Sequence, residues 1–187
     1  YILSPFKNRE ENLRTAIAYF KKAEALRENL NLEILPSIIY AYGMLFDVSH
    51  DPEALKNFKT AVSAYQSKIA DNPALLSEIA GAYIMVSGVD EEKEKSLRTA
   101  IALLKKSLKQ KKRAISDTRF AMMNFFLGKA YFRMAELENP EQNLKSAISC
   151  FDIVVNKMPE KVYPIDYTEA MLELGIVYLQ LHQISSD

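Results

Sequence analysis

The chain has 187 residues, 49% of them hydrophobic, which is enough material to bury a core in one domain or one short repeat array. Basic and acidic side chains are equal in number at 24 each, so no overall charge attracts nucleic acid or an anionic membrane. Seven prolines and five glycines are too few for an all-β protein, the single cysteine excludes an internal disulfide, and no apolar stretch reaches the ~18 residues of a membrane span. We therefore expect a soluble, cytoplasmic, all-α protein.

In chain order, the first predicted helix covers about residues 11–29, where Leu13, Ala16, Ile17 and Phe20 recur with helical spacing. Similar apolar patterns predict helices at about 53–70, 92–110 and 142–157. Each contains a related string with a base, a hydroxyl, an alanine and a β-branched residue in the same order. The strings are Asn12-Leu-Arg-Thr-Ala-Ile17, Asn57-Phe-Lys-Thr-Ala-Val62, Ser96-Leu-Arg-Thr-Ala-Ile101 and Asn143-Leu-Lys-Ser-Ala-Ile148. We call these four segments the B helices.

A second series of helices, the A helices, alternates with the first. Their cores are predicted at 39–46, 77–84, 124–131 and 171–178, each with a central glycine. These glycines, Gly43, Gly81, Gly128 and Gly175, are separated by 38, 47 and 47 residues. A glycine inside a helix costs about 0.8–1 kcal/mol relative to alanine, so its recurrence indicates that a neighbouring helix approaches closely there. We expect each glycine to face the hairpin partner of its helix.

Two helix starts are marked by a capping side chain followed by proline. Asp51 precedes Pro52, and Asn139 precedes Pro140. Proline suits the first turn of a helix, and the side chain of the preceding residue can accept a bond from a free backbone N–H group.

The two series together resemble the tetratricopeptide repeat, whose signature is Leu-Gly-x2-Tyr in one helix and Ala-x3-Phe followed by proline in the next. Matches include Leu127-Gly128-x2-Tyr131, Leu174-Gly175-x2-Tyr178 and Ala147-x3-Phe151 with Pro159. The tryptophan of the signature is absent, and the period exceeds the standard 34 residues. The resemblance implies a right-handed α-solenoid of helix-turn-helix repeats, in which the whole chain is one array. Its parts are a partial repeat at about 1–30 with a B helix only, repeats at 31–72, 73–113 and 114–160, and a partial repeat at 161–187 with an A helix only.

The resemblance also implies a function in protein interaction. Long repeats with Glu-Asn-Leu-x-x-Ala-Ile and a Pro-x-Asp-Tyr lead, as at 11–17 and 164–167, are similar to bacterial arrays beside CHAT protease or signalling ATPase domains. We therefore expect a protein scaffold that binds a peptide or partner helix. The alternatives are an intrachain regulatory array that restrains an attached catalytic domain, and a carrier of an apolar ligand; self-association of the array stays open.

No cofactor-binding, metal-binding or catalytic motif was found, so we expect neither an enzyme nor a cofactor. Cys150, His50 and His182 are far apart in the sequence, which gives the thiol no evident base and no zinc ligand set. The cluster Lys105 to Arg113 carries six bases without an acid. We interpret it as a solvated helix end. The alternatives are a binding site for an acidic protein partner and a binding site for nucleic acid.

The resemblance implies that the residue after each A-helix glycine, and those three before it and four after it, point into a concave groove. Most of these positions are apolar, and two hold methionines, which adapt readily to a partner. Phe125 and Phe132 are expected to be the main anchors. The partner-binding residues predicted in this way are Tyr40, Met44, Met85, Phe125, Lys129, Phe132 and Ile176.

Overall fold

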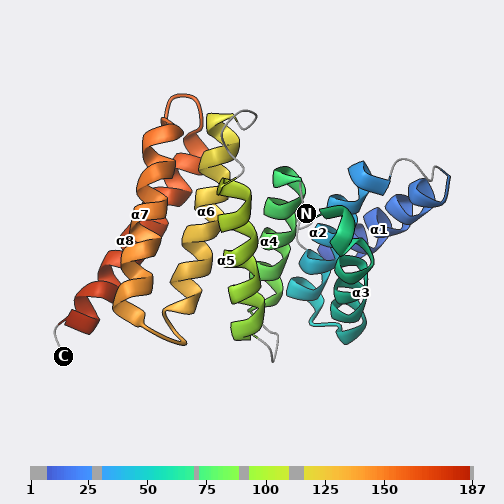
Figure 1. Cartoon of the computed structure of the whole chain (residues 1–187), viewed down its shortest axis with the longest axis horizontal. Coiled ribbons are helices and arrows are strands. Elements are labelled where there is room, and N and C mark those ends of the chain that lie inside the picture. The colour runs from blue at the N-terminus through green and yellow to red at the C-terminus, as the bar shows by residue number, and fades with distance from the viewer. Residues whose placement is uncertain (1–7, 27–30, 70–71, 89–92, 110–115, 186–187) are drawn as a thin grey trace, which may run out of the picture. The chain divides into compact units, whose positions relative to one another are not determined.

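The computed structural model describes residues 8–26, 31–69, 72–88, 93–109 and 116–185, and within these ranges it contains α-helices and no strand (Figure 1). The all-α class is therefore confirmed. The helices of the described ranges are α1 (Arg9–Leu26), α2 (Asn31–Ser49), α3 (Pro52–Ile69), α4 (Pro73–Val86), α5 (Lys93–Lys109), α6 (Asp117–Met134), α7 (Pro140–Lys157) and α8 (Pro164–Ser185). The expected B helices are α1, α3, α5 and α7, and the expected A helices are α2, α4, α6 and α8.

The helices form two compact units, Tyr1–Lys93 and Glu94–Asp187. Unit 1 contains α1 to α4, and unit 2 contains α5 to α8 apart from the first residue of α5. The division falls after the first residue of α5 and so separates α4 from the rest of α5, although the sequence pattern assigns the two helices to the same repeat, 73–113.

In unit 1, α2 packs against α1, α3 and α4. The buried centre is formed by large apolar side chains such as Ile39 of α2, Phe58 of α3 and Leu76 of α4. The most hydrophobic helices of the unit, α2 and α4, are buried on several sides, whereas α1 buries only Ile17 and exposes the rest of its surface wholly or in part.

The glycine of α2 permits a close helix contact, but not with the predicted neighbour. A Cβ atom at Gly43 would lie 3.1 Å from the Cβ atom of Ala82, which belongs to α4. The prediction of close approach is thus confirmed for Gly43, and the prediction that it faces α3 is wrong. The small side chain of Ala82 explains the choice, because two small residues opposite each other allow two backbones to come close. Gly81 is buried inside α4.

In unit 2, α7 packs between α6 and α8. Its core side chains, among them Leu144 and Phe151, are fully buried. The opposite side of α6 meets α5, where the Ser107 hydroxyl donates to the sulfur of Met123 at 3.3 Å. Helix α6 therefore has a neighbour on each of two sides.

The two glycines of unit 2 differ in their surroundings. A Cβ atom at Gly128 would lie 2.7 Å from the Phe151 ring of α7, so only glycine fits without a shift of that ring. Here the predicted contact with the hairpin partner is confirmed. A Cβ atom at Gly175 would meet no described atom within 4 Å. The expected close contact at Gly175 is therefore absent from the described structure.

The two predicted helix starts also differ. The backbone N–H of Glu53 donates to the Asp51 carboxylate at 2.9 Å, which confirms Asp51 as a cap of α3. Asn139 makes no capping bond with its side chain, and its φ of 44° places it in the left-handed region, so the prediction of a capping side chain is wrong there. Asparagine adopts this conformation more readily than most residues, and it turns the chain into α7.

The base of the recurring string links successive B helices of a unit. Arg14 of α1 pairs with Asp51, at the start of α3, at 3.0 Å. Arg98 of α5 pairs with Glu138, just before α7, at 2.7 Å. Each arginine also pairs with an acid one turn earlier in its own helix. Exposed pairs of this kind stabilise a protein only slightly.

Candidate partner-binding surface

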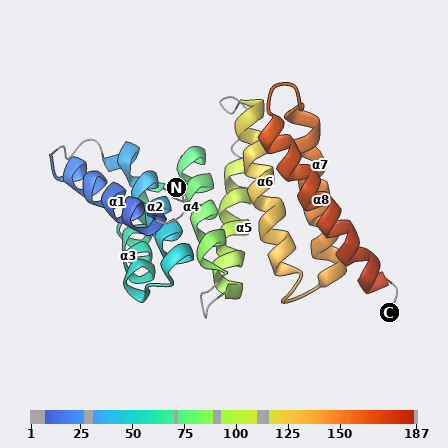
Figure 2. The same ribbon diagram turned by 180° about the vertical axis from the view of Figure 1, so that it is seen from behind.

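Helix α8 has one covered side and one open side. Ala170, Leu174 and Val177 are buried in the core that α8 shares with α7. On the opposite side, Leu172 is 64% exposed and Leu179 is 67% exposed. In Figure 2, α8 lies in front of α7 and no other helix lies in front of α8. The open side is thus apolar, although nothing in the described structure covers it.

Large exposed apolar side chains are concentrated on this helix. Elsewhere in the described residues they occur singly or in pairs, as Tyr19 and Leu26 on α1. An apolar patch of contiguous residues is a common mark of a protein-binding surface, whereas isolated exposed residues are not. Ile165, Leu172, Ile176 and Leu179 share the side of α8 opposite its buried residues, and we call these four residues the α8 face.

Two of the predicted binding residues, Ile176 and Lys129, lie at or near the α8 face. Ile176 belongs to it and is 38% exposed. Lys129 of α6 reaches α8, because its ammonium group lies 3.4 Å from the Glu173 carboxylate. Phe132 of α6 is partly buried against the core of unit 2. Leu172 and Leu179, which are more exposed than Ile176, were not among the seven predicted residues.

Phe125 is not the exposed anchor that the sequence analysis expected. Its side chain is only 8% exposed, and its ring packs edge-to-face on Phe151 with centroids 5.8 Å apart. The ammonium group of Lys129 covers it at 5.3 Å from the ring centroid. Phe125 thus belongs to the contact between α6 and α7, and a partner cannot reach most of its ring.

The other three predicted residues lie in unit 1. Tyr40 and Met44 of α2 and Met85 of α4 are partly exposed. Burial raises the pKa of the Tyr40 hydroxyl, and the nearby Glu78 carboxylate raises it further. The seven predicted residues are therefore divided between the two units: three lie in unit 1 and four lie in unit 2.

The charges of α8 have one sign. The helix carries Asp166, Glu169 and Glu173 in its N-terminal half and contains no lysine or arginine. Glu173 is paired with Lys129 of α6. An apolar surface with acidic residues at one end favours a partner whose apolar residues are accompanied by bases.

The cysteine is a buried, protonated thiol. Burial raises the pKa of Cys150 to about 12, although Lys105 opposes the shift. A thiol with such a pKa is a poor nucleophile at neutral pH. His50 is exposed in unit 1, and His182 is exposed near the end of α8 in unit 2. Among the described residues, no three or more histidine, cysteine or acidic side chains are grouped to hold a metal ion.

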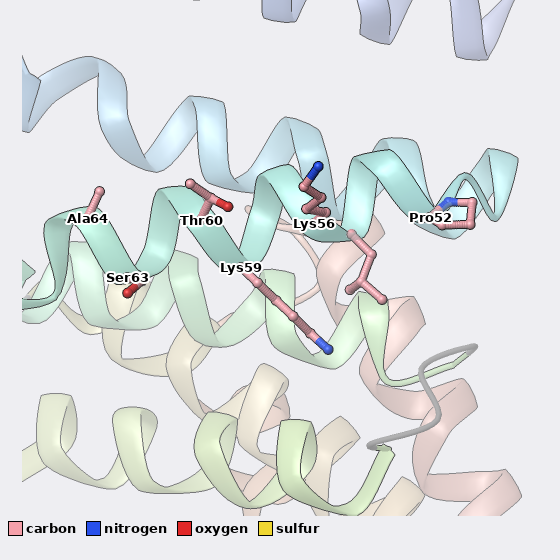
Figure 3. Close-up of a pocket in the computed structure, with 7 residues that line it drawn as sticks. Pro52, Lys56, Lys59, Thr60, Ser63 and Ala64 are labelled. Carbon is pink, nitrogen blue, oxygen red and sulfur yellow. The ribbon is translucent and has the colours of Figure 1, made fainter.

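Three of the hollows on the described surface are each lined by a single helix. Figure 3 shows one of them on α3, where Lys56 and Lys59 both line the hollow. A second lies on the face of α7 that has the same position relative to the recurring string, and the third lies on α8 between Pro164 and Leu172. Hollows with one wall cannot enclose a lipid chain or a small molecule, so they give no support to the carrier alternative.

The basic cluster is only partly described. Lys106 and Lys109 are exposed in the last turn of α5, where cations favour the helix dipole. Lys105 lies over the Tyr131 ring at 5.4 Å. The remaining bases, Lys111, Lys112 and Arg113, lie outside the described residues. The described part of the cluster therefore does not extend the α8 face.

Comparisons with known proteins found no matching family model, no similar curated protein and no similar solved structure. Within the described residues, no helix is both long and apolar enough to cross a lipid bilayer.

Proposed function

We propose that this protein is an interaction scaffold, built as a right-handed α-solenoid of tetratricopeptide-like repeats, which binds a helix or peptide of another polypeptide. The observation that supports the proposal best is the α8 face. Four large apolar side chains on one side of the helix are exposed while the opposite side of the same helix is packed. Leaving such a face in water is unfavourable by about 25 cal/mol for each Å² that a partner would cover.

The mechanism requires no chemical step. The contact with α7 holds α8 in place, so a partner binds a preformed surface, and little free energy is spent on ordering the receptor. An amphipathic helix suits a helical groove because its apolar residues recur at i, i+3, i+4 and i+7. Lys129 of α6, which pairs with Glu173 of α8, contributes at the edge of the surface. In unit 1, Tyr40, Met44 and Met85 are proposed as a second, smaller contact region.

A selection experiment tests this function without a known partner. Amphipathic helical peptides are selected from a displayed random library on the intact chain, and the selected peptides are titrated by fluorescence anisotropy. The double variant Leu172→Asp/Ile176→Asp should weaken their binding at least ~30-fold, as expected for the loss of an interaction hot spot of about 2 kcal/mol or more.

The matched control is Gln142→Asp/Ser149→Asp, which places the same charges on the exposed face of α7. Both residues are exposed, so circular dichroism should show an unchanged helix content for this variant and for the α8 variant. Equal binding by the wild-type chain and the α8 variant would refute the proposed surface.

A further inference from the structure

One acidic side chain of α8 lies within its apolar face. Glu169 follows Ile165 by four residues and precedes Leu172 by three, so the three side chains share one side of the helix. Glu169 is exposed, and Asp166, three residues before it, is partly exposed. The last acid of α8 is Glu173, so the C-terminal half of the helix carries no carboxylate side chain. The α8 face is therefore acidic only at its N-terminal end.

The Glu169 carboxylate has no base beside it. It forms no ion pair or hydrogen bond with any described residue, whereas Glu173 is held by the Lys129 ammonium group at 3.4 Å. Helix α8 contains no lysine or arginine, and in the turn before it the charge of Lys161 is balanced by Glu160. The N-terminal end of the α8 face thus carries an excess of negative charge, which favours a partner with bases at the corresponding place.

A shallow hollow surrounds this carboxylate. It is lined by Pro164, Ile165, Thr168, Glu169 and Leu172, all of α8. The Thr168 hydroxyl donates to the Pro164 carbonyl oxygen at 2.7 Å, so it is already bonded within the helix. A second helix lying on the face would supply the wall that the hollow lacks. An apolar lining with one carboxylate suits lysine or arginine, because the aliphatic stem of these residues packs on apolar surface while the charged group reaches the acid.

The helix dipole decides which end of a partner helix suits this place. Bases in the last turn of a helix are favoured by its own dipole, and bases in the first turn are disfavoured. The last turn of an antiparallel partner lies beside the N-terminal half of α8, where the acids are. The distribution of charge along α8 therefore favours an antiparallel helix whose bases follow its apolar residues.

We infer that the α8 face binds a basic amphipathic helix of another polypeptide in antiparallel orientation. A lysine or arginine near the end of the partner helix occupies the hollow and pairs with Glu169, and the apolar residues of its preceding turns pack on Leu172, Ile176 and Leu179. Ten residues separate Glu169 from Leu179, which is about 15 Å of helix. This inference rests on the proposed function, because it names the chemistry of the partner for the same surface.

Three synthetic peptides, titrated on the intact chain by fluorescence anisotropy, test the inference. All three have leucines at i, i+3, i+4 and i+7. The first has lysines in its last turn, the second has the same lysines in its first turn, and the third has glutamates in its last turn. The first should bind most tightly. The second should bind about 2- to 5-fold more weakly because of its dipole, and the third at least ~10-fold more weakly because of repulsion by the acids of α8.

Charge reversal at Glu169 provides the decisive measurement. Glu169→Lys should shift the ratio of the affinities for the first and third peptides at least ~10-fold towards the glutamate peptide, and this ratio is independent of the helix content of each peptide. The matched control is Asp152→Lys, at an exposed position of α7, which should leave the ratio unchanged. Both residues are exposed, so circular dichroism should show the helix content of the wild type for both variants.

Two results would overturn the inference: equal binding of the three peptides by the wild-type chain, or a ratio that Glu169→Lys does not change. The Leu172→Asp/Ile176→Asp variant separates this failure from that of the proposed function. If either result is found and this variant still loses peptide binding, only the inference fails. If the variant binds the peptides like the wild type, the proposed function fails as well.

Discussion

Replacing Gly128 by alanine tests whether close packing of α6 on α7 is the reason for the recurring glycine. Gly175→Ala is the matched control, because Gly175 has the same place in the repeat and an open environment. A Cβ atom at position 128 would lie 2.7 Å from a ring carbon of Phe151, whereas a Cβ atom at position 175 would contact no described atom within 4 Å. Phe151 is fully buried, so its ring has little room to move.

Both substitutions gain helix propensity, but only one of them overpacks the core. Alanine gains up to about 1 kcal/mol over glycine in a helix interior, and this gain applies at both positions. Overpacking of a filled core costs about 1–3 kcal/mol, and this cost applies only at position 128. Gly175→Ala should therefore stabilise the protein by up to about 1 kcal/mol, and Gly128→Ala should leave it roughly 1–3 kcal/mol less stable than Gly175→Ala.

Chemical denaturation followed by circular dichroism measures both values, at a concentration low enough to keep the chain monomeric. For a protein of this size, 1 kcal/mol corresponds to roughly 2–4 °C in melting temperature. A further variant, Phe151→Leu, removes the ring that the new methyl group would meet. Adding Gly128→Ala to Phe151→Leu should therefore cost less than adding it to the wild type. Equal stabilisation by alanine at positions 128 and 175 would refute the argument.

Three further predictions concern single side chains. Phe125→Ala should destabilise unit 2 by about 3–5 kcal/mol, because the ring is part of the core, and a denaturation midpoint equal to that of the wild type would contradict this. Cys150 should resist alkylation at neutral pH until the chain is unfolded. The folded pKa of its thiol lies above the ordinary value, so the free energy of unfolding should not depend on this group below about pH 9. From there towards pH 12 it should fall by about 1.4 kcal/mol per pH unit. The Cys150→Ala variant should lack this slope. Arg98→Met removes the pairs with Glu94 and Glu138, so its melting temperature should fall slightly at low salt and match the wild type at high salt, and a salt-independent loss would point to packing instead.

The repeated strings and the glycine spacing were sufficient to predict the order and type of the helices. The observed α1, α3, α5 and α7 coincide closely with the predicted B helices, and each glycine of the A series lies inside a helix. Helical periodicity is a local property, since one turn of the chain sets which residues share a side. The cap at Asp51 was equally predictable, because it depends on residues two positions apart.

The site was only partly predictable. Ile176 was selected correctly as an exposed residue, but Phe125, at the counterpart position of Leu172, was predicted to be exposed and is buried. Both residues lie on apolar sides of helices with the same register, and the repeat pattern gives them the same role. The difference is that α7 covers α6 at Phe125, whereas nothing described covers α8 at Leu172.

The sequence by itself determined the helices, their alternation and the apolar sides that they carry. Only the tertiary structure decided which neighbour meets each side: Gly43 meets Ala82 of α4, Gly128 meets Phe151 of α7, and Gly175 meets no described atom. The physical reason is that a side chain's type fixes its tendency to leave water, but its burial depends on a second element arriving from elsewhere in the chain or from another molecule.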